Sequence, residues 1–336
     1  MIGKLSINEV AEHILVSAGG LLSGERCLIV SDETTRDLIP SFFDCGRRLG
    51  AEMELATISV MESHGIEPPT DVAEAMARAD LIVALTKMSL AHTKARLAAT
   101  GGKSRHLSLP GYSAEMMRNP CLLINYQAQF GLTRGMADAF TRGREVRVKT
   151  PAGTDITMNI DGRIGNCCPG FVNYQYRLGS PPDVEANVSP RETYSNGVIV
   201  VDGAITCDGI GRVRCPVTLN VGAGQLTGIK SESAEYVRII KDLFERVGDE
   251  KAFTLAECGV GLNPKAEITG HMLTDEAAFG CVHFGFGSNA MVGGQNDVPF
   301  HVDFVTRNGS IWIDDEPILI GGNPIENRAH EPNEKV

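Results

Sequence analysis

The hydrophobic pattern of this chain changes near residue 143, and this change constrains the fold more than any other feature of the sequence. Before it, short apolar runs at residues 27–30 and 81–85 alternate with amphipathic segments such as residues 70–79. Strands that alternate with helices in this way are typical of βαβ units and a parallel sheet. We therefore expect residues 1–143 to form an open α/β domain.

From residue 144 onward the pattern is β-rich and interrupted by glycine. Residues 145–162 alternate apolar and polar side chains around a turn at 151–153, which predicts a hairpin. An amphipathic helix is predicted near residues 237–247, where apolar side chains recur at helical spacing. We predict a β-rich α+β domain over residues 144–336. Its further strands are expected at residues 198–202, 216–221, 254–262, 280–287, 300–306 and 311–319.

Composition excludes several classes of function. The 336 residues carry 31 basic and 42 acidic side chains, for a formal net charge of −11, which argues against binding to nucleic acid or to an anionic membrane. No apolar run is long enough to span a membrane, and residues 1–20 lack the layout of a signal peptide. The nine cysteines include no CxxC pair, which favours reduced thiols. We expect a cytoplasmic protein.

The segment FHVDFV at residues 300–305 is the most informative about chemistry. Alternate side chains of a strand point to opposite faces, so His301 and Asp303 project together while the apolar residues face a core. An imidazole and a carboxylate in this arrangement can hold Zn, Fe, Mn or Co. Taken alone, the spacing also fits a solvated polar face.

Two other predicted strands repeat this arrangement. In each, one possible ligand shares a face with two glycines: His283 with Gly285 and Gly287, and Glu257 with Gly259 and Gly261. Glycine inside a strand is unfavourable, and close approach of a ligand or of another backbone is a common reason for it. The alternative is that these glycines only ease bending or packing of the sheet. Three strands with one design favour a shared metal site.

Residues 256–305 resemble the C-terminal signature of the aminopeptidase T and aminopeptidase S family of metallopeptidases. The resemblance rests on AECGVGLN, TDEAAFGCVHFGFG and PFHVDFV, and TPAGTDITMNIDGR and PPDVEANVSP extend it upstream. It implies a homodimer with the site in a cleft between domains or subunits. It also implies five metal ligands, which are Glu185, Glu257, His283, His301 and Asp303.

Three carboxylates and two imidazoles suit two adjacent divalent cations that share one carboxylate. The resemblance then implies a hydrolase with two Zn, Co or Mn ions, in which metal-activated water cleaves an N-terminal peptide bond or a small-molecule amide. Glu257 and Glu276 are the candidates for general base. The alternative for Glu276, together with Asp275, is an exposed turn between two strands.

A second resemblance provides an alternative function. The peptidases carry a tyrosine where this chain has Ala290, and the loop from Gly287 to Pro299 is shorter here. The closing pattern G-G…P-x-H-x-D, which ends at Asp303, is similar to that of 2,5-dihydroxypyridine dioxygenases. Those enzymes hold one Fe(II) with two histidines and one aspartate, which leaves positions open for a ring substrate and oxygen.

The ligand set separates the two functions. The second histidine of the dioxygenases falls where this chain has Glu257, and they carry non-ligand residues at the positions of Glu185 and His283. The retention of all five peptidase positions favours the hydrolase, with the iron dioxygenase as the alternative.

Two interpretations without a metal are weaker. A nucleotide fingerprint at residues 285–290 lacks a following helix, and a non-enzymatic scaffold would bind no stoichiometric metal.

Overall fold

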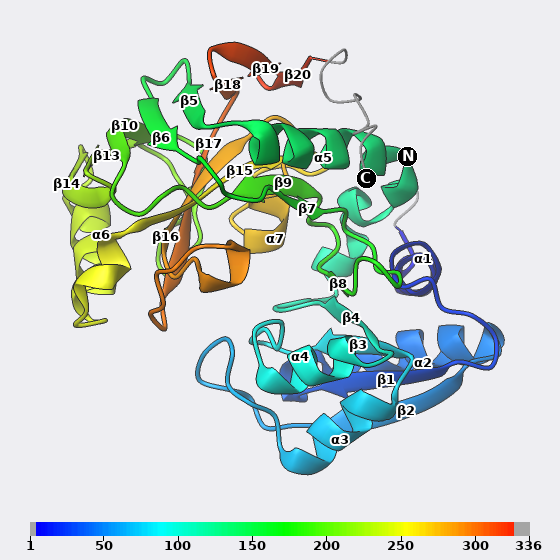
Figure 1. Cartoon of the computed structure of the whole chain (residues 1–336). Coiled ribbons are helices and arrows are strands. Elements are labelled where there is room, and N and C mark those ends of the chain that lie inside the picture. Colours follow the sequence, from blue (N-terminus) through cyan, green and yellow to red (C-terminus); the bar gives the residue numbers. More distant parts are fainter. Residues whose placement is uncertain (1–4, 326–336) are drawn as a thin grey trace. The chain divides into compact units, whose positions relative to one another are not determined.

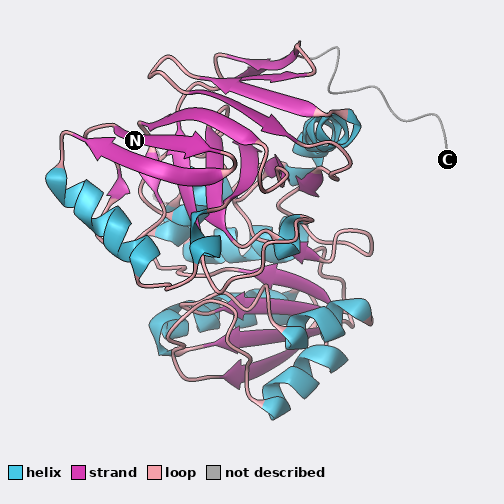
Figure 2. Cartoon of the chain, turned by 60° about the vertical axis from the view of Figure 1, so that its left-hand side comes forward, coloured by secondary structure: helices cyan, strands magenta, loops and turns pink. Residues whose placement is uncertain are grey.

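The computed structural model describes residues 5–325 of the chain. It forms two compact units, the first from Met1–Ala128 and Pro169–Pro182 and the second from Gln129–Cys168 and Asp183–Val336. One parallel sheet and two large, mainly antiparallel sheets confirm the predicted α/β plus β-rich fold class. Figure 1 labels these elements along the chain, and Figure 2 separates helices from strands by colour.

The first unit is built on a five-stranded parallel sheet in the order β2-β1-β3-β4-β8. Its strands are β1 (Arg26–Ser31), β2 (Glu52–Thr57), β3 (Leu81–Leu85), β4 (Arg105–Ser108) and β8 (Leu178–Gly179). Its helices are α1 (Ile7–His13), α2 (Ile39–Arg48), α3 (Thr70–Arg78) and α4 (Lys94–Gly101). Every residue of β3 is buried, as expected for a parallel strand covered on both faces.

The second unit contains an eight-stranded sheet in the order β14-β13-β10-β6-β5-β18-β19-β20. These strands are β5 (Glu145–Lys149), β6 (Asp155–Asn159), β10 (Ser195–Val201), β13 (Val217–Gly222), β14 (Gln225–Ser231), β18 (Ser310–Ile313), β19 (Glu316–Ile320) and β20 (Asn323–Pro324). Strands β5 and β6 form the predicted hairpin.

A seven-stranded sheet in the order β12-β11-β17-β16-β15-β9-β7 completes the second unit. Its strands are β7 (Asn166–Cys168), β9 (Glu185–Val188), β11 (Ala204–Ile205), β12 (Gly211–Arg212), β15 (Leu255–Gly261), β16 (Val282–Gly287) and β17 (His301–Thr306). The helices of this unit are α5 (Tyr126–Arg142, which begins at the end of the first unit), α6 (Ala234–Glu245) and α7 (Met272–Asp275). Helix α6 confirms the predicted amphipathic helix.

One predicted strand is wrong in detail. Residues 311–319 were expected to form a single strand, but they belong to the β18–β19 hairpin. The turn residues Asp314 and Asp315 have φ of 49° and 66°, which is the left-handed pair that a tight hairpin turn requires. An Asp-Asp pair is a weaker turn signal than Asn-Gly, so the sequence pattern continues through it.

The rings of Phe286 and Phe304 project from the seven-stranded sheet onto α6. Phe244 of α6 lies 6.1 Å from Phe286 and 6.4 Å from Phe304 between ring centroids. This aromatic core occupies one face of β16 and β17 and so leaves the opposite face to His283, His301 and Asp303. Within residues 5–325, no helix has the length and apolar character needed to cross a membrane.

Candidate metal centre

Four neighbouring strands of the seven-stranded sheet, β17, β16, β15 and β9 (Figure 1), carry the five predicted ligands. Residues directly opposite each other in antiparallel strands share a face, so the strand register decides which side chains meet. In each cross-strand row a possible ligand lies opposite a glycine. The rows are Glu257–Gly285–Asp303, Gly259–His283 and Gly261–Glu185.

The glycines leave the space that the ligands occupy. A Cβ atom on Gly259 would lie 2.0 Å from Nε2 of His283. A Cβ atom on Gly285 would lie 2.6 Å from Nε2 of His301 and 2.9 Å from Cβ of Glu257. All three distances are too short for a carbon atom, so close approach of the ligand side chains explains these two strand glycines.

The donor atoms form two groups that share Glu257, and within each group they lie within 4.8 Å of one another. In the first group, Nε2 of His301 lies 3.2 Å from Oδ1 of Asp303 and 3.5 Å from Oε2 of Glu257. In the second group, Nε2 of His283 lies 3.1 Å from Oε2 of Glu185 and 3.7 Å from Oε1 of Glu257. The two oxygens of Glu257 therefore face different imidazoles.

The ring of His301 is oriented by the backbone. Its Nδ1 lies 2.8 Å from the carbonyl oxygen of Ser288 and can donate to it, which leaves Nε2 as the lone-pair atom that faces the carboxylates. The side chain of His301 is 33% exposed, whereas that of His283 is 1% exposed. The first group is thus accessible to solvent and the second is closed.

Ionisation in the cluster is strongly perturbed. Burial is the largest single influence on the pKa of His283 and acts to lower it, but the Glu185 charge and the hydrogen bonds with Cys281, Glu185 and Glu257 together raise the pKa well above its usual range. The pKa of His301 is raised to about 10, because Asp303 and Glu257 outweigh burial in the same way. Burial raises the pKa of Glu257, and the neighbouring carboxylates Glu185 and Asp303 add to this.

These observations fit a cation-binding site. Buried carboxylates outnumber the imidazoles, and a surplus of buried negative charge must be offset by protons or by cations. Oε2 of Glu185 is buried and receives no hydrogen bond within the described residues, although it faces His283. Imidazole and carboxylate donors that converge as closely as Nε2 of His301 and Oδ1 of Asp303, 3.2 Å apart, are suited to divalent transition metals.

Glu276 also belongs to this cluster. It follows α7, and its carboxyl group hydrogen-bonds Asp303. Burial raises its pKa well above the usual range, and the Asp303 charge adds to the effect. The alternative of an exposed turn is wrong, because Asp275 is buried and accepts hydrogen bonds from the backbone N–H groups of Thr269 and Gly270.

Asp183 is a neighbour of the cluster that the sequence analysis missed. Burial raises its pKa well above the usual range, with Glu185 as the next largest cause, and its Oδ1 has no hydrogen-bond partner within residues 5–325. Asp183 precedes Glu185 by two residues, the same spacing as His301 and Asp303. Asp183 lies before the first residue of β9, so the alternation that identifies His301 and Asp303 does not apply to it.

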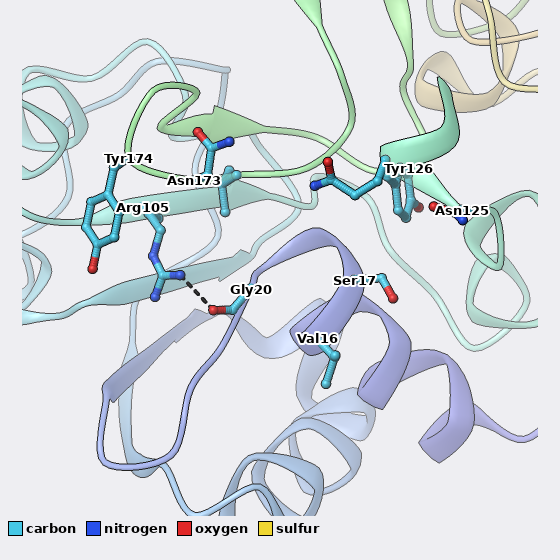
Figure 3. Close-up of a pocket in the computed structure, with 10 residues that line it drawn as sticks. Val16, Ser17, Gly20, Arg105, Asn125, Tyr126, Asn173 and Tyr174 are labelled. Carbon is cyan, nitrogen blue, oxygen red and sulfur yellow. Dashed lines mark hydrogen bonds between the residues drawn. The ribbon is translucent and has the colours of Figure 1, made fainter. Parts of the chain in front are cut away.

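A pocket in the first unit offers different chemistry. It has a volume of about 340 Å³, and Figure 3 shows Arg105, Gly20, Tyr126 and Tyr174 among the residues that line it. The guanidinium of Arg105 is already bound to the Gly20 carbonyl at 2.8 Å and to the Glu25 carboxylate at 2.5 Å. The charge of Arg105 is therefore already neutralised by Glu25 and is not available to a ligand in this pocket. Among the described residues, neither cluster of possible metal ligands lines this pocket.

Comparisons with known proteins support both resemblances. The family model described as 2,5-dihydroxypyridine 5,6-dioxygenase (NicX) matches residues 15–326. The 2,5-dihydroxypyridine 5,6-dioxygenase of Pseudomonas putida KT2440 is 28% identical over 202 residues. That alignment covers 56% of this chain and 57% of the relative, so it spans little more than half of either protein.

Two solved structures share the fold. The 2,5-dihydroxypyridine dioxygenase from Pseudomonas putida KT2440 has a TM-score of 0.79 at 18% identity, over 98% of this chain and 100% of that one. Wild-type AmpT from Thermus thermophilus has a TM-score of 0.69 at 16% identity, over 95% of this chain and 98% of its own. At these identities the structures show the fold alone. Since the family model covers nearly the whole sequence, the chain belongs to the 2,5-dihydroxypyridine 5,6-dioxygenase family.

Proposed function

We propose that this protein is an iron-dependent dioxygenase that opens the ring of a hydroxylated nitrogen heterocycle of the dihydroxypyridine type. The observation that carries the proposal is the family match over residues 15–326. The accessible donor group of Glu257, His301 and Asp303 supports it. The order of the two functions inferred from sequence is thereby reversed, because the match favours the dioxygenase over the hydrolase.

Glu257, His301 and Asp303 would hold the metal ion. An ion held by only these three protein groups would still be able to bind a ring substrate and oxygen, and the partial exposure of His301 gives access from solvent. A bound ferrous ion supplies the one-electron chemistry that lets oxygen react with an electron-rich ring. The Ser288 carbonyl fixes the imidazole of His301 so that its Nε2 would be available to such an ion.

Glu276 is the proposed proton carrier, with Glu257 as the other candidate. The Oε1 atom of Glu276 is buried and has no hydrogen-bond partner within residues 5–325. Its carboxyl group hydrogen-bonds Asp303, which places a proton donor or acceptor directly beside the accessible donor group. Since the Asp303 carboxylate is the acceptor of this hydrogen bond, Glu276 carries the proton. Glu276 would first donate this proton to an oxygen atom of the bound reactants and could then, as a carboxylate, accept a proton from a ring hydroxyl.

A second candidate is hydrolysis of an N-terminal peptide bond or a small amide. The specific observation that favours it is the second donor group, because Glu185 and His283 share Glu257 with the first group. Two ions bridged by Glu257 would acidify a shared water and polarise a carbonyl. In the dioxygenase, by contrast, Glu185 and His283 only surround the iron ligands.

Anaerobic purification with metal analysis distinguishes the two functions. The dioxygenase predicts one ferrous ion per chain and consumption of one oxygen molecule per molecule of 2,5-dihydroxypyridine or a close analogue. Two Zn, Co or Mn ions per chain, with release of an amine from amide substrates and no oxygen uptake, would instead establish the hydrolase. A chain that binds no transition metal contradicts both.

A further inference from the structure

Residues 288–299 connect β16 to β17 and therefore join the strands that carry His283 and His301. This connection, called the 288–299 loop below, has an exposed tip at Ala290 and Met291. Its interior is held by two buried asparagines. The Asn296 N–H donates to Oδ1 of Asn289 at 2.7 Å, and the Asn296 side chain donates to the Gly287 carbonyl at 2.7 Å.

Glu192 binds this loop from outside. Its Oε1 accepts from Nδ2 of Asn289 at 3.0 Å and from the backbone N–H of Gln295 at 2.8 Å. Its Oε2 accepts from Nη2 of Arg163 at 2.6 Å, and Nη1 of Arg163 donates to the Gly293 carbonyl at 2.7 Å. The side chain of Glu192 is 24% exposed and that of Arg163 is 12% exposed. Together they bind the loop at Asn289, Gly293 and Gln295.

The loop is in turn bonded to both donor groups of the cluster. Its Ser288 carbonyl accepts from Nδ1 of His301 at 2.8 Å. On the other side, Nδ2 of Asn166 donates to the Val292 carbonyl at 3.1 Å and to Oδ1 of Asn187 at 2.8 Å. Nδ2 of Asn187 donates to Oε1 of Glu185 at 2.6 Å. Hydrogen bonds therefore connect the loop to His301 and to Glu185.

We propose that Glu192, paired with Arg163, is a positioning residue of the metal centre. It holds the 288–299 loop so that the Ser288 carbonyl orients His301 and the Val292 carbonyl orients Asn166. Glu192 acts only through these groups, since none of its hydrogen bonds reaches a donor of the cluster. The inference rests on the proposed function insofar as the cluster binds a metal ion.

Metal affinity tests the proposal directly. The probe is Mn²⁺ or Co²⁺, titrated into metal-free wild-type protein, Glu192→Ala and Glu192→Gln. We expect Glu192→Ala to bind about 10–100-fold more weakly, the usual effect of losing a group that orients a ligand. Glu192→Gln keeps an oxygen acceptor but loses the ion pair with Arg163, so we expect an intermediate loss. The Co²⁺ absorption spectrum should shift in both variants.

The control is Glu232→Ala, which removes an exposed carboxylate far from the loop in sequence and should leave affinity unchanged. A purely structural Glu192 would lower the melting temperature while the folded variants bind Co²⁺ with wild-type affinity and spectrum, and that result overturns the inference alone. A wild-type protein that binds neither ion overturns the proposed function and the inference together. If Glu192→Ala does not fold, Glu192→Gln decides by the same criteria.

Discussion

His106 in the first unit and His283 in the second are both almost completely buried, yet their surroundings give opposite charges. Neither ring nitrogen of His106 has a hydrogen-bond partner in the described structure, and burial, with a smaller effect from Arg96, lowers its pKa to about 3. At His283 the Glu185 charge, together with hydrogen bonds to Cys281, Glu185 and Glu257, reverses the effect of burial and raises the pKa. Burial alone keeps an imidazole neutral, whereas a surplus of buried carboxylates creates a place for positive charge.

The largest effect is expected from removing a ligand of the accessible group. His301→Ala or Asp303→Ala should weaken metal binding at least about 1,000-fold, beyond the ~10–100-fold effect of supporting residues, and should abolish activity. The protein should stay folded, since both side chains lie on the polar face of β17. Metal analysis and circular dichroism check this. A metal-replete, active His301→Ala protein would falsify the ligand assignment.

A finer comparison separates the two donor groups. Glu257→Gln removes the shared carboxylate and should weaken binding to both groups by about 100-fold. Glu185→Gln affects only the group of His283. For a mononuclear dioxygenase, Glu185→Gln should keep most of its iron and oxygen uptake, whereas a dinuclear hydrolase would lose one ion and its activity. Calorimetric titration gives the stoichiometry, and identical behaviour of the two variants would contradict the division into groups.

His106 provides the corresponding test in the first unit. Its pKa is about 3 when folded and 6.5 when unfolded, so the unfolded chain binds a proton that the folded chain excludes. The stability lost to this group therefore grows as pH falls from 6.5 towards 3, reaching about 2 kcal/mol at pH 5. His106→Leu should remove this part of the pH dependence. Hydrogen exchange of β3 and β4 amides at pH 7.5 and pH 5 measures it. Equal destabilisation of variant and wild type at pH 5 would contradict the neutral imidazole.

The smallest effect concerns the space beside the ligands. Gly259→Ala places a methyl group against His283, and Gly285→Ala places one against His301. Each should weaken its own donor group by about 10-fold, as displaced ligand orientation does. Gly101→Ala, whose Cβ would meet nothing within 4 Å, is the matched control. Cobalt spectra that are unchanged in both strand variants would show that the glycines serve only packing.

The sequence predicts most of this site because its geometry follows from strand alternation. His301 and Asp303, and the glycines beside His283 and Glu257, share one face as the period-two pattern requires. Glu185 comes from the resemblance alone, since the four-residue strand β9 is too short to show a pattern. Asp183 has no sequence signal of this kind, because it precedes the first residue of β9.

Other features could not be predicted because they depend on contacts distant in the chain. Glu192 and Arg163 lie 29 residues apart in the chain, and they contact each other and the 288–299 loop only in the folded structure. The short strand β8 joins the parallel sheet through pairing with β4, which no local pattern indicates. Residue spacing also cannot distinguish the dioxygenase from the hydrolase, because both resemblances include the same H-x-D strand at His301 and Asp303.

Anomalous diffraction from crystals grown anaerobically with Fe²⁺ tests the central claim most directly. The account predicts an iron peak within bonding distance of Glu257, His301 and Asp303, at about 2.0–2.2 Å from nitrogen and oxygen donors as for similar divalent ions. A well-ordered structure with iron bound elsewhere, or with these three side chains turned away from a bound ion, would contradict it.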